Sequence, residues 1–210
     1  MAANQARDQI VGNELRCERG SRLLFENLNF SVSTGQAMII QGSNGAGKTS
    51  LLRIITGLSQ PAHGQVLWND NNIEDISEEY QQDLLYIGHL AAVKRELTVR
   101  ENLQLLQRFW PNDAGGSIAD LADKVGLRKR LSVTCSRLSA GQLRRVSLAR
   151  LFISTQKLWI LDEPLTALDV DFIESVEVCL QNHLKQGGLA ILTTHRGIDL
   201  GDQHSFMLNL

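Results

Sequence analysis

The strongest constraint on this chain is the run Gly42-Ser43-Asn44-Gly45-Ala46-Gly47-Lys48-Thr49, which has the form G-x-x-x-x-G-K-[ST]. It follows residues 37–40, an apolar run that predicts a buried strand, and precedes residues 51–58, which predict a short helix ended by a glycine. Such a loop can point several backbone N–H groups at one anion, and the positive end of the helix strengthens the attraction. The alternative is a glycine-rich turn that ends in Lys-Thr by chance, which requires neither the strand nor the helix. We therefore predict that this whole run binds the phosphates of a nucleotide.

Two side chains of the run have separate expected roles. Lys48 can reach the β- and γ-phosphates as a point charge, and the Thr49 hydroxyl can hold Mg²⁺. The expected ligands are therefore a nucleoside triphosphate and Mg²⁺.

Composition argues against several other kinds of protein. With 210 residues the chain can bury one sizeable core, and its net charge of −2 argues against a surface devoted to nucleic acid. Its three cysteines are scattered, without metal-binding or haem-attachment spacing, which indicates reduced thiols in a cytosolic protein. No apolar run approaches the ~20 residues of a membrane span, and residues 1–9 lack the apolar centre of a signal peptide. Any contact with a membrane is therefore expected to come through a partner.

Strand patterns fill the first part of the chain and return near its end. Residues 1–8 look frayed, a turn is expected at Arg19-Gly20-Ser21, and residues 69–82 are polar and predict an irregular segment. Alternation and short apolar runs predict strands over residues 10–18, 24–33, 65–68, 84–88, 158–161, 189–194 and 206–210.

The middle of the chain has helical periodicity instead. Thr98 followed by Glu101 is a capping-box pattern, and residues 111–116 break the helix that it opens. We expect helices over residues 98–109, 118–125, 139–152 and 170–186. These patterns predict one domain over residues 1–210. Its α/β core, about 1–92 and 153–210, is interrupted by a mostly helical subdomain, about 93–152.

Two acids end the apolar run at residues 158–161. A buried strand can deliver Asp162 and Glu163 to its carboxyl end, beside the phosphate loop. Asp162 suits Mg²⁺, directly or through water, and Glu163 suits a general base that polarises an attacking water. An apolar run ending in Asp-Glu is more often a plain strand end, but its position about 110 residues after the phosphate loop favours the catalytic interpretation.

A second anion site is predicted at Leu138-Ser139-Ala140-Gly141-Gln142. Ser139 can cap a helix N-terminus, and Gly141 allows a backbone to approach closely. Taken alone, Ser139 is only a helix cap. The run is similar to Leu-Ser-Gly-Gly-Gln, the signature of the ABC ATPases.

With these motifs the chain resembles an ABC nucleotide-binding domain over nearly its whole length. The resemblance implies a P-loop NTPase (RecA-like) core with an antiparallel β subdomain and an inserted α-helical subdomain. It also implies ATP hydrolysis with Mg²⁺ by a head-to-tail homodimer, in which Ser139 and Gly141 of one copy cover the γ-phosphate held by the other. By position, Asp169 resembles the loop residue that crosses this dimer interface, and His195 resembles the switch histidine that contacts the γ-phosphate.

Two positions depart from the family pattern. The family has a glutamine that helps to bind Mg²⁺ at the end of the strand after the loop helix, and this chain has His89 there. The family stacks adenine on an aromatic residue between the first two strands, and the matching position here is about Arg19. A guanidinium plane can stack on a ring, but a solvated turn arginine explains Arg19 equally well.

His89 and its surroundings also narrow the family. Leu85-Tyr86-Ile87-Gly88-His89 and Glu101-Asn102-Leu103 are similar to the ATPase subunit of the cytochrome c maturation system, a family of haem exporters. The resemblance implies an integral membrane subunit as partner, associated haem-handling proteins, and a peripheral location at the cytoplasmic face of the bacterial inner membrane. No nucleic-acid partner is expected.

Three other functions compete with this interpretation. A soluble ABC ATPase acting on DNA or ribosomes usually has two cassettes or a long coiled-coil insert, and this chain has one motif set and no heptad run. A small-molecule kinase would use the same phosphate loop but would not need Ser139 and Gly141 before a second helix. An ABC transporter ATPase with other cargo would have the same motifs, because the membrane subunit selects the cargo.

Overall fold

The computed structural model describes residues 8–109, 116–200 and 205–210, which form two compact units. The first unit takes in the described residues of 1–86, 156–162 and 181–210, and the second takes in those of 87–155 and 163–180. The frayed end predicted at 1–8 and the helix break predicted at 111–116 lie almost wholly outside the described residues. The boundaries of the helical subdomain predicted from the sequence stay a prediction.

An antiparallel sheet of four strands, in the order β2-β1-β4-β5, forms one layer of the first unit. Its strands are β1 (Gln9–Arg19), β2 (Arg22–Ser33), β4 (His63–Trp68) and β5 (Asn71–Asn72). The hairpin of β1 and β2 turns at Gly20, whose φ of 63° lies in the left-handed region that glycine tolerates. The predicted strand–turn–strand unit is confirmed.

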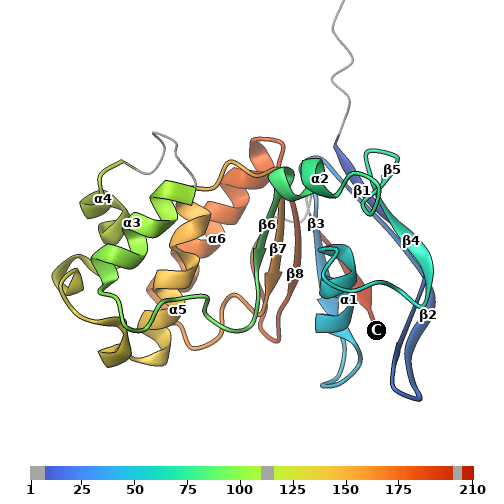
Figure 1. The fold of residues 1–210 in the computed structure, drawn as a ribbon, viewed down its shortest axis with the longest axis horizontal. Helices are drawn as coiled ribbons and strands as arrows, with labels where there is room; N and C mark the ends of the chain where they lie inside the picture. Colours follow the sequence, from blue (N-terminus) through green and yellow to red (C-terminus); the bar gives the residue numbers. More distant parts are fainter. Residues whose placement is uncertain (1–7, 110–115, 201–204) are drawn as a thin grey trace, which may run out of the picture. The chain divides into compact units, whose positions relative to one another are not determined.

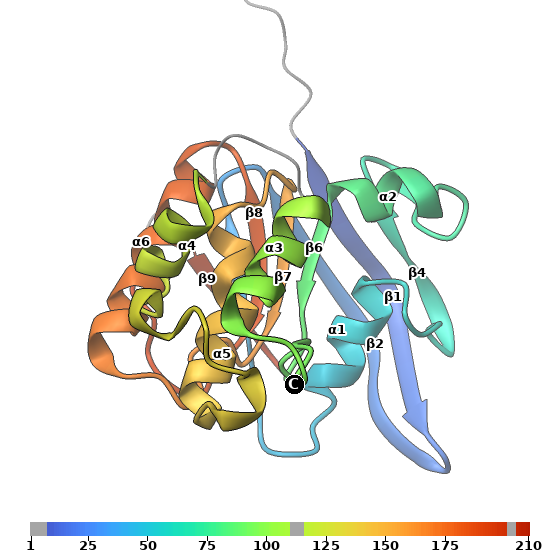
Figure 2. The same ribbon diagram turned by 60° about the vertical axis from the view of Figure 1, so that its left-hand side comes forward.

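A second sheet of five strands has the order β6-β7-β8-β3-β9 (Figure 2). Its strands are β3 (Ala37–Gln41), β6 (Leu84–Ile87), β7 (Leu158–Asp162), β8 (Leu189–Thr193) and β9 (Ser205–Asn209). The strand β3 pairs in parallel with β8 and β9, and β7 pairs in parallel with β8. Because parallel strands end at one edge, the residues after β3, β7 and β8 are brought to the same edge of the sheet.

Helix α1 (Lys48–Ile55) lies between these two sheets (Figure 1). Its residues Leu51, Leu52, Ile54 and Ile55 are at most 2% exposed, and they join one apolar cluster with side chains from both sheets. The phosphate loop that precedes α1 is therefore held by a helix with apolar contacts on both sides.

The polar stretch over residues 69–82 is not irregular, as predicted, but contains helix α2 (Ser77–Asp83). Within the helix only Tyr80 is buried, and its hydroxyl donates a hydrogen bond of 2.7 Å to the Ile55 carbonyl at the end of α1. One aromatic anchor thus fixes a helix whose other residues are polar, which is why helical periodicity did not reveal it.

The second unit is mostly helical. Its elements include α3 (Val99–Phe109), α4 (Ile118–Lys124), α5 (Ala140–Leu148), the 3₁₀ turns Arg128–Arg130, Cys135–Arg137 and Ala149–Phe152, and α6 (Val170–Lys185) as far as Leu180. The predicted capping box is confirmed, because the Glu101 carboxylate accepts from the Thr98 backbone N–H at 2.7 Å and the Thr98 hydroxyl accepts from the Glu101 N–H at 3.2 Å. No helix in the described part of the chain is both long and apolar enough to span a bilayer.

Candidate nucleotide-binding site

The phosphate loop leads from β3 directly into α1. Gly47 caps the helix with a φ of 110°, and a side chain there would meet Leu24 and Phe25 of β2 at 3.2 Å. Lys48 is buried, with only 8% of its surface exposed. Its ammonium donates to the carbonyls of Gly42 at 2.7 Å and Ser43 at 3.3 Å. The lysine therefore closes the loop on itself and points its charge at the centre of the loop.

Asp162, at the end of β7, meets the phosphate loop through Thr49. The Thr49 hydroxyl donates to Asp162 Oδ2 at 3.1 Å, and the Thr193 hydroxyl donates to Oδ1 at 2.8 Å. The carboxylate is only 3% exposed, so these hydrogen bonds offset part of its desolvation. Thr193 was not singled out from the sequence, where a hydroxyl at the end of an apolar strand carries no signal of its own.

The oxygen atoms of Thr49 and Asp162 fit Mg²⁺, which prefers hard oxygen ligands. Among the described residues no three His, Cys, Asp or Glu side chains cluster as a metal site. A cation here therefore needs further oxygens from water and from the phosphates, which is the usual arrangement for Mg²⁺ beside a nucleotide.

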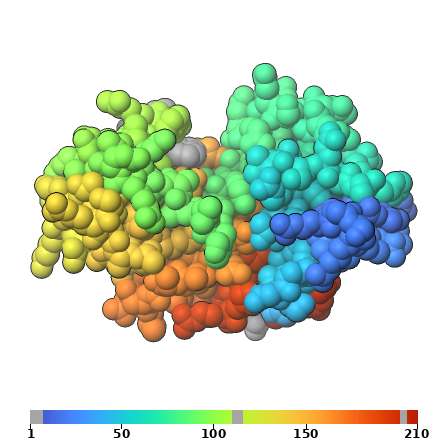
Figure 3. Space-filling model, turned by 60° about the horizontal axis from the view of Figure 1, so that its bottom comes forward, coloured from blue at the N-terminus to red at the C-terminus, as the bar shows by residue number. Residues whose placement is uncertain are grey.

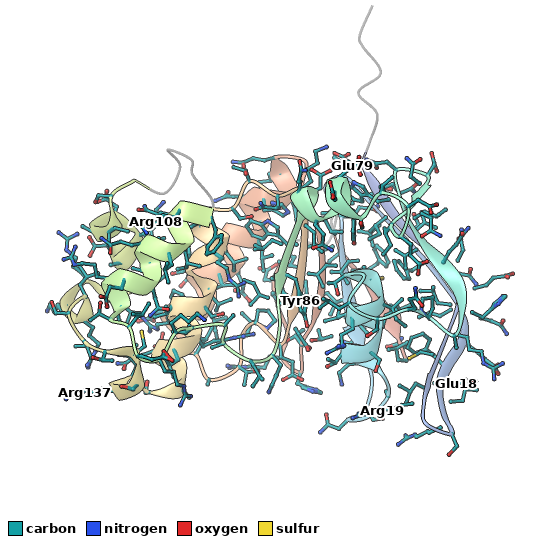
Figure 4. All side chains as sticks on the ribbon, in the orientation of Figure 1. Glu18, Arg19, Glu79, Tyr86, Arg108 and Arg137 are labelled. Carbon is teal, nitrogen blue, oxygen red and sulfur yellow. The ribbon has the colours of Figure 1, made fainter. Side chains whose placement is uncertain are left out.

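A cavity of about 430 Å³ lies between the tip of β1 and the first turns of α1. Arg19, the last residue of β1, lines it together with Thr49, Ser50 and Arg53 of α1. Figure 4 labels Arg19 at the hairpin tip, and Figure 3 shows the face on which this hairpin and the lighter-blue phosphate loop lie next to each other. Thr49 of the phosphate-loop run thus also lines the cavity, and the contact of Arg19 with a nucleotide stays a prediction.

Cys17 also lines this cavity. Burial raises the pKa of its thiol, and a hydrogen bond with Ser50 partly opposes that rise. The thiol is therefore protonated at neutral pH, and the three cysteines of the chain are all free.

His195 follows β8 and is exposed. The hydroxyl of Thr194 donates to the Arg196 carbonyl at 3.0 Å and accepts from the Arg196 N–H at 3.1 Å, so a tight turn surrounds the histidine. His195 therefore stands at the sheet edge where β7 delivers Asp162, and its contact with a phosphate stays a prediction.

In the second unit, Ser139 caps helix α5. Its hydroxyl accepts from the Gln142 N–H at 3.2 Å, and its own N–H donates to the Gln142 side chain at 3.1 Å. The predicted cap is thus confirmed as a capping box. Ser139 is exposed, which leaves the helix N-terminus accessible to an anion.

Gly141 lies against the loop after Pro164, because a Cβ built on it would collide with the carbonyl oxygen of Ala167. Ala167 has a φ of 63°, so the backbone of this loop is already strained and cannot easily move away from an added Cβ.

We expect Gly141→Ala to lower the free energy of unfolding by about 1–3 kcal/mol, measured by urea denaturation. The neighbouring exposed Ala140→Gly should change it by at most about 1 kcal/mol. Equal effects of the two substitutions would contradict the collision.

The same loop is tied to α5 through Asp169. One carboxylate oxygen accepts from the Phe172 N–H at 3.0 Å and caps α6, and the other pairs with Arg145. The Phe172 N–H first, and the Arg145 guanidinium second, lower the pKa of Asp169. The guanidinium also lies 4.7 Å from the centre of the Phe172 ring.

Glu163, which follows Asp162 by one peptide bond, has a strained backbone. Its φ is 48°, in the left-handed region that costs a residue with a Cβ about 1–2 kcal/mol. Its carboxylate accepts from the Thr166 hydroxyl at 3.3 Å, and its carbonyl accepts from the Arg144 guanidinium at 2.9 Å. The same guanidinium reaches the carbonyl of His89 at 3.4 Å, while the His89 side chain is exposed.

The predicted residues thus fall into two groups. The first unit brings together the phosphate loop, Thr49, Asp162 and the Arg19 cavity, with His195 at the same sheet edge. The second unit holds Ser139, Gly141, Glu163 and His89. Arg144 was missed, because nothing in the sequence around this helical arginine, which is followed by Arg145, indicates the carbonyls that it contacts.

Two solved structures with this fold are both ATP-binding proteins of ABC transporters. The subject of "Structure of ATP binding subunit of ABC transporter" superposes with a TM-score of 0.77 at 26% identity over 89% of this chain and 79% of that chain. A putative ABC transporter ATP-binding protein from Pyrococcus furiosus gives a TM-score of 0.78 over 95% of this chain and 97% of that chain. At 22% identity the second shows the shared fold alone. Fold and phosphate loop together define an ABC ATPase domain.

Comparison of the sequence with known proteins indicates the same class of protein and a particular family within it. The family described as ABC transporter matches residues 25–166. The Cytochrome c biogenesis ATP-binding export protein CcmA of Aliivibrio fischeri is 49% identical, over 87% of this chain and 89% of its own length. The protein of the same name from Photobacterium profundum is 47% identical, over 91% of this chain and 94% of its own length. The chain therefore belongs to the ABC transporter family and, within it, to the CcmA family of ATP-binding proteins.

Proposed function

We propose that the chain is the ATP-binding and ATP-hydrolysing subunit of an ABC transporter complex that serves cytochrome c biogenesis. The observation that carries the ATPase part is the junction of Thr49, Asp162 and Thr193, which joins the phosphate loop to the carboxyl edge of the parallel sheet. The relatives named for cytochrome c biogenesis support the second part, with 47% to 49% identity over most of the chain.

In the proposed mechanism the phosphate loop and Lys48 bind the triphosphate. The ammonium exchanges the Gly42 and Ser43 carbonyls for β- and γ-phosphate oxygens, which hold it more strongly because they are charged. Thr49 and Asp162 would hold Mg²⁺, which neutralises phosphate charge when it is bound. Arg19 faces the cavity proposed for the nucleoside.

Glu163 is the proposed general base. Its carboxylate accepts a proton from a water molecule as the water oxygen bonds to the γ-phosphorus and the bond to the β,γ-bridging oxygen breaks. His195 contacts the γ-phosphate from the end of β8. The exposed side chain of His89 occupies the position of the glutamine that helps to bind Mg²⁺ in the family, and its contribution to metal binding is part of the proposal.

Two copies are proposed to bind two ATP molecules between them. Ser139 and Gly141, at the open N-terminus of α5 in one copy, cover the γ-phosphate held by the loop of the other. Hydrolysis removes the phosphate that both copies share, so the dimer is stable before hydrolysis and opens after it.

An apolar groove in the second unit is the proposed site for a partner. Leu105, Leu106 and Phe109 of α3, with Val93 and Val146, line an apolar groove of about 110 Å³. Phe109 is 75% exposed. Leu90, which shortly precedes the groove residue Val93 in sequence, is 83% exposed. We propose that a cytoplasmic segment of an integral membrane subunit binds here, at the cytoplasmic face of the bacterial inner membrane, in a complex with haem-handling proteins.

The test is capture of the membrane subunit. The tagged chain, purified from detergent-solubilised membranes, should retain an integral membrane protein, and Phe109→Glu should weaken that capture. Val178→Glu is the matched control, because Val178 is 49% exposed on α6 and outside the groove. Both variants should bind ATP as the unmodified chain does. Capture of no membrane protein, or equal loss in both variants, would contradict the proposed partner surface.

A further inference from the structure

The Arg144 guanidinium is buried at a junction of three segments of the second unit. The residue is 5% exposed on α5, and it donates to four backbone carbonyls. One side of the fork reaches Glu163 at 2.9 Å and Pro164 at 3.3 Å. The other side reaches Gly88 at 2.9 Å and His89 at 3.4 Å. Its hydrogen bonds therefore link the segment of the proposed base to the segment after β6.

The geometry at Glu163 needs such a support. A left-handed residue before a proline is unfavourable on two grounds, since the Cβ crowds its carbonyl and the proline ring restricts the preceding residue. Two of the four carbonyls that Arg144 binds belong to Glu163 and Pro164, so the guanidinium holds the backbone of both residues at the strained position. The direction of the Glu163 side chain follows from that backbone.

We propose that Arg144 is a positioning residue for Glu163: it holds the strained backbone so that the carboxylate is aimed correctly, and it makes this aim depend on the Gly88–His89 segment. The inference rests on the proposed function, in which Glu163 is the base. Arg144 itself contacts main-chain oxygens and acts on the reaction through Glu163.

The adjacent arginine has a different task. Arg145 pairs with Asp169 and covers Phe172, so it fixes the start of α6.

A planar guanidinium is required at Arg144 because its carbonyl acceptors lie on two sides, whereas a lysine ammonium is a single point that cannot reach both. Arg144→Lys therefore keeps the charge and loses the bridge.

We expect Arg144→Lys to lower kcat for ATP hydrolysis by about 10- to 100-fold, as misplacement of a reacting group does, while KM for ATP stays within about threefold. Arg150→Lys is the matched control. Arg150 lies in the 3₁₀ turn that follows α5 and donates hydrogen bonds to Ser147. Burial first and the charge of Arg144 second lower its pKa to about 10. This control should leave kcat within about threefold. Thermal unfolding of each variant checks that both are folded.

A double variant separates positioning from a general structural role. If Arg144 acts only through the Glu163 carboxylate, Arg144→Lys added to Glu163→Gln should lower the residual rate no further. A multiplied loss in the double variant, or an unchanged kcat in Arg144→Lys alone, overturns the inference. Should Glu163→Gln itself hydrolyse ATP at the unmodified rate, the proposed base is wrong, and that result is distinct from a failure of Arg144 alone.

Discussion

Glu163→Gln is expected to lower the rate of ATP hydrolysis by about 10²–10⁴-fold and to leave ATP binding intact. The amide has nearly the shape of the carboxylate but cannot accept the proton of the attacking water. The contacts of Arg144 with the Glu163 carbonyl do not involve the side chain, so the strained backbone should persist in the variant. Phosphate release measures the rate, and titration with a fluorescent ATP analogue measures binding.

The same variant should accumulate the ATP-bound dimer, because the phosphate shared by two copies is no longer removed. Size-exclusion chromatography with saturating Mg-ATP should show a dimer that is absent without nucleotide. Glu174→Gln, at an exposed acid on α6, is the control and should turn over ATP normally. A normal rate in Glu163→Gln would falsify the base assignment. A variant that is slow but monomeric, even with the membrane subunit, would contradict the shared-phosphate dimer.

Much of the fold could be predicted, because most of its helices and strands have a recognisable pattern in their own local sequence. The continuous apolar runs of β7 and β8 are typical of strands that are buried on both faces. The alternation of β1 and β2 is typical of strands that bury one face. Helix α2 could not be found in this way, because its contacts are with residues distant in sequence: Tyr80 donates to the Ile55 carbonyl, Gln81 donates to the Thr56 carbonyl, and Asp83 accepts from the Trp68 indole.

The residues of the candidate site likewise differ in whether the local sequence could identify them. Lys48, Thr49 and Asp162 were found because phosphate chemistry demands those residue types at a fixed spacing after a strand. Thr193 and Arg144 were missed, since each is defined by a contact with a residue distant in sequence, Asp162 for one and Glu163 for the other. Motifs therefore predict which residues contact the ligand, and the structure is needed to identify the groups that hold those residues in place.

Lys48→Met is expected to lower the affinity for ATP by about 10- to 100-fold, because two charge-assisted hydrogen bonds to phosphate are lost and each contributes about 1.5–3 kcal/mol before compensation. At saturating ATP the rate of hydrolysis should fall by about 10²-fold or more, since the charge that stabilises the transferring phosphoryl group is absent. Isothermal titration calorimetry and phosphate release measure the two effects.

Loss of the ammonium also removes its hydrogen bonds to the Gly42 and Ser43 carbonyls, so the empty loop should become less ordered. The control is Lys157→Met, at a half-exposed lysine just before β7 that pairs with Asp8. It removes the same charge from the same unit and should change neither ATP affinity nor rate. If Lys48→Met binds ATP as tightly as Lys157→Met does, the triphosphate does not lie in the loop between β3 and α1. In that case the cavity beside Arg19 cannot be the nucleoside site either, because its position is argued from that of the phosphates.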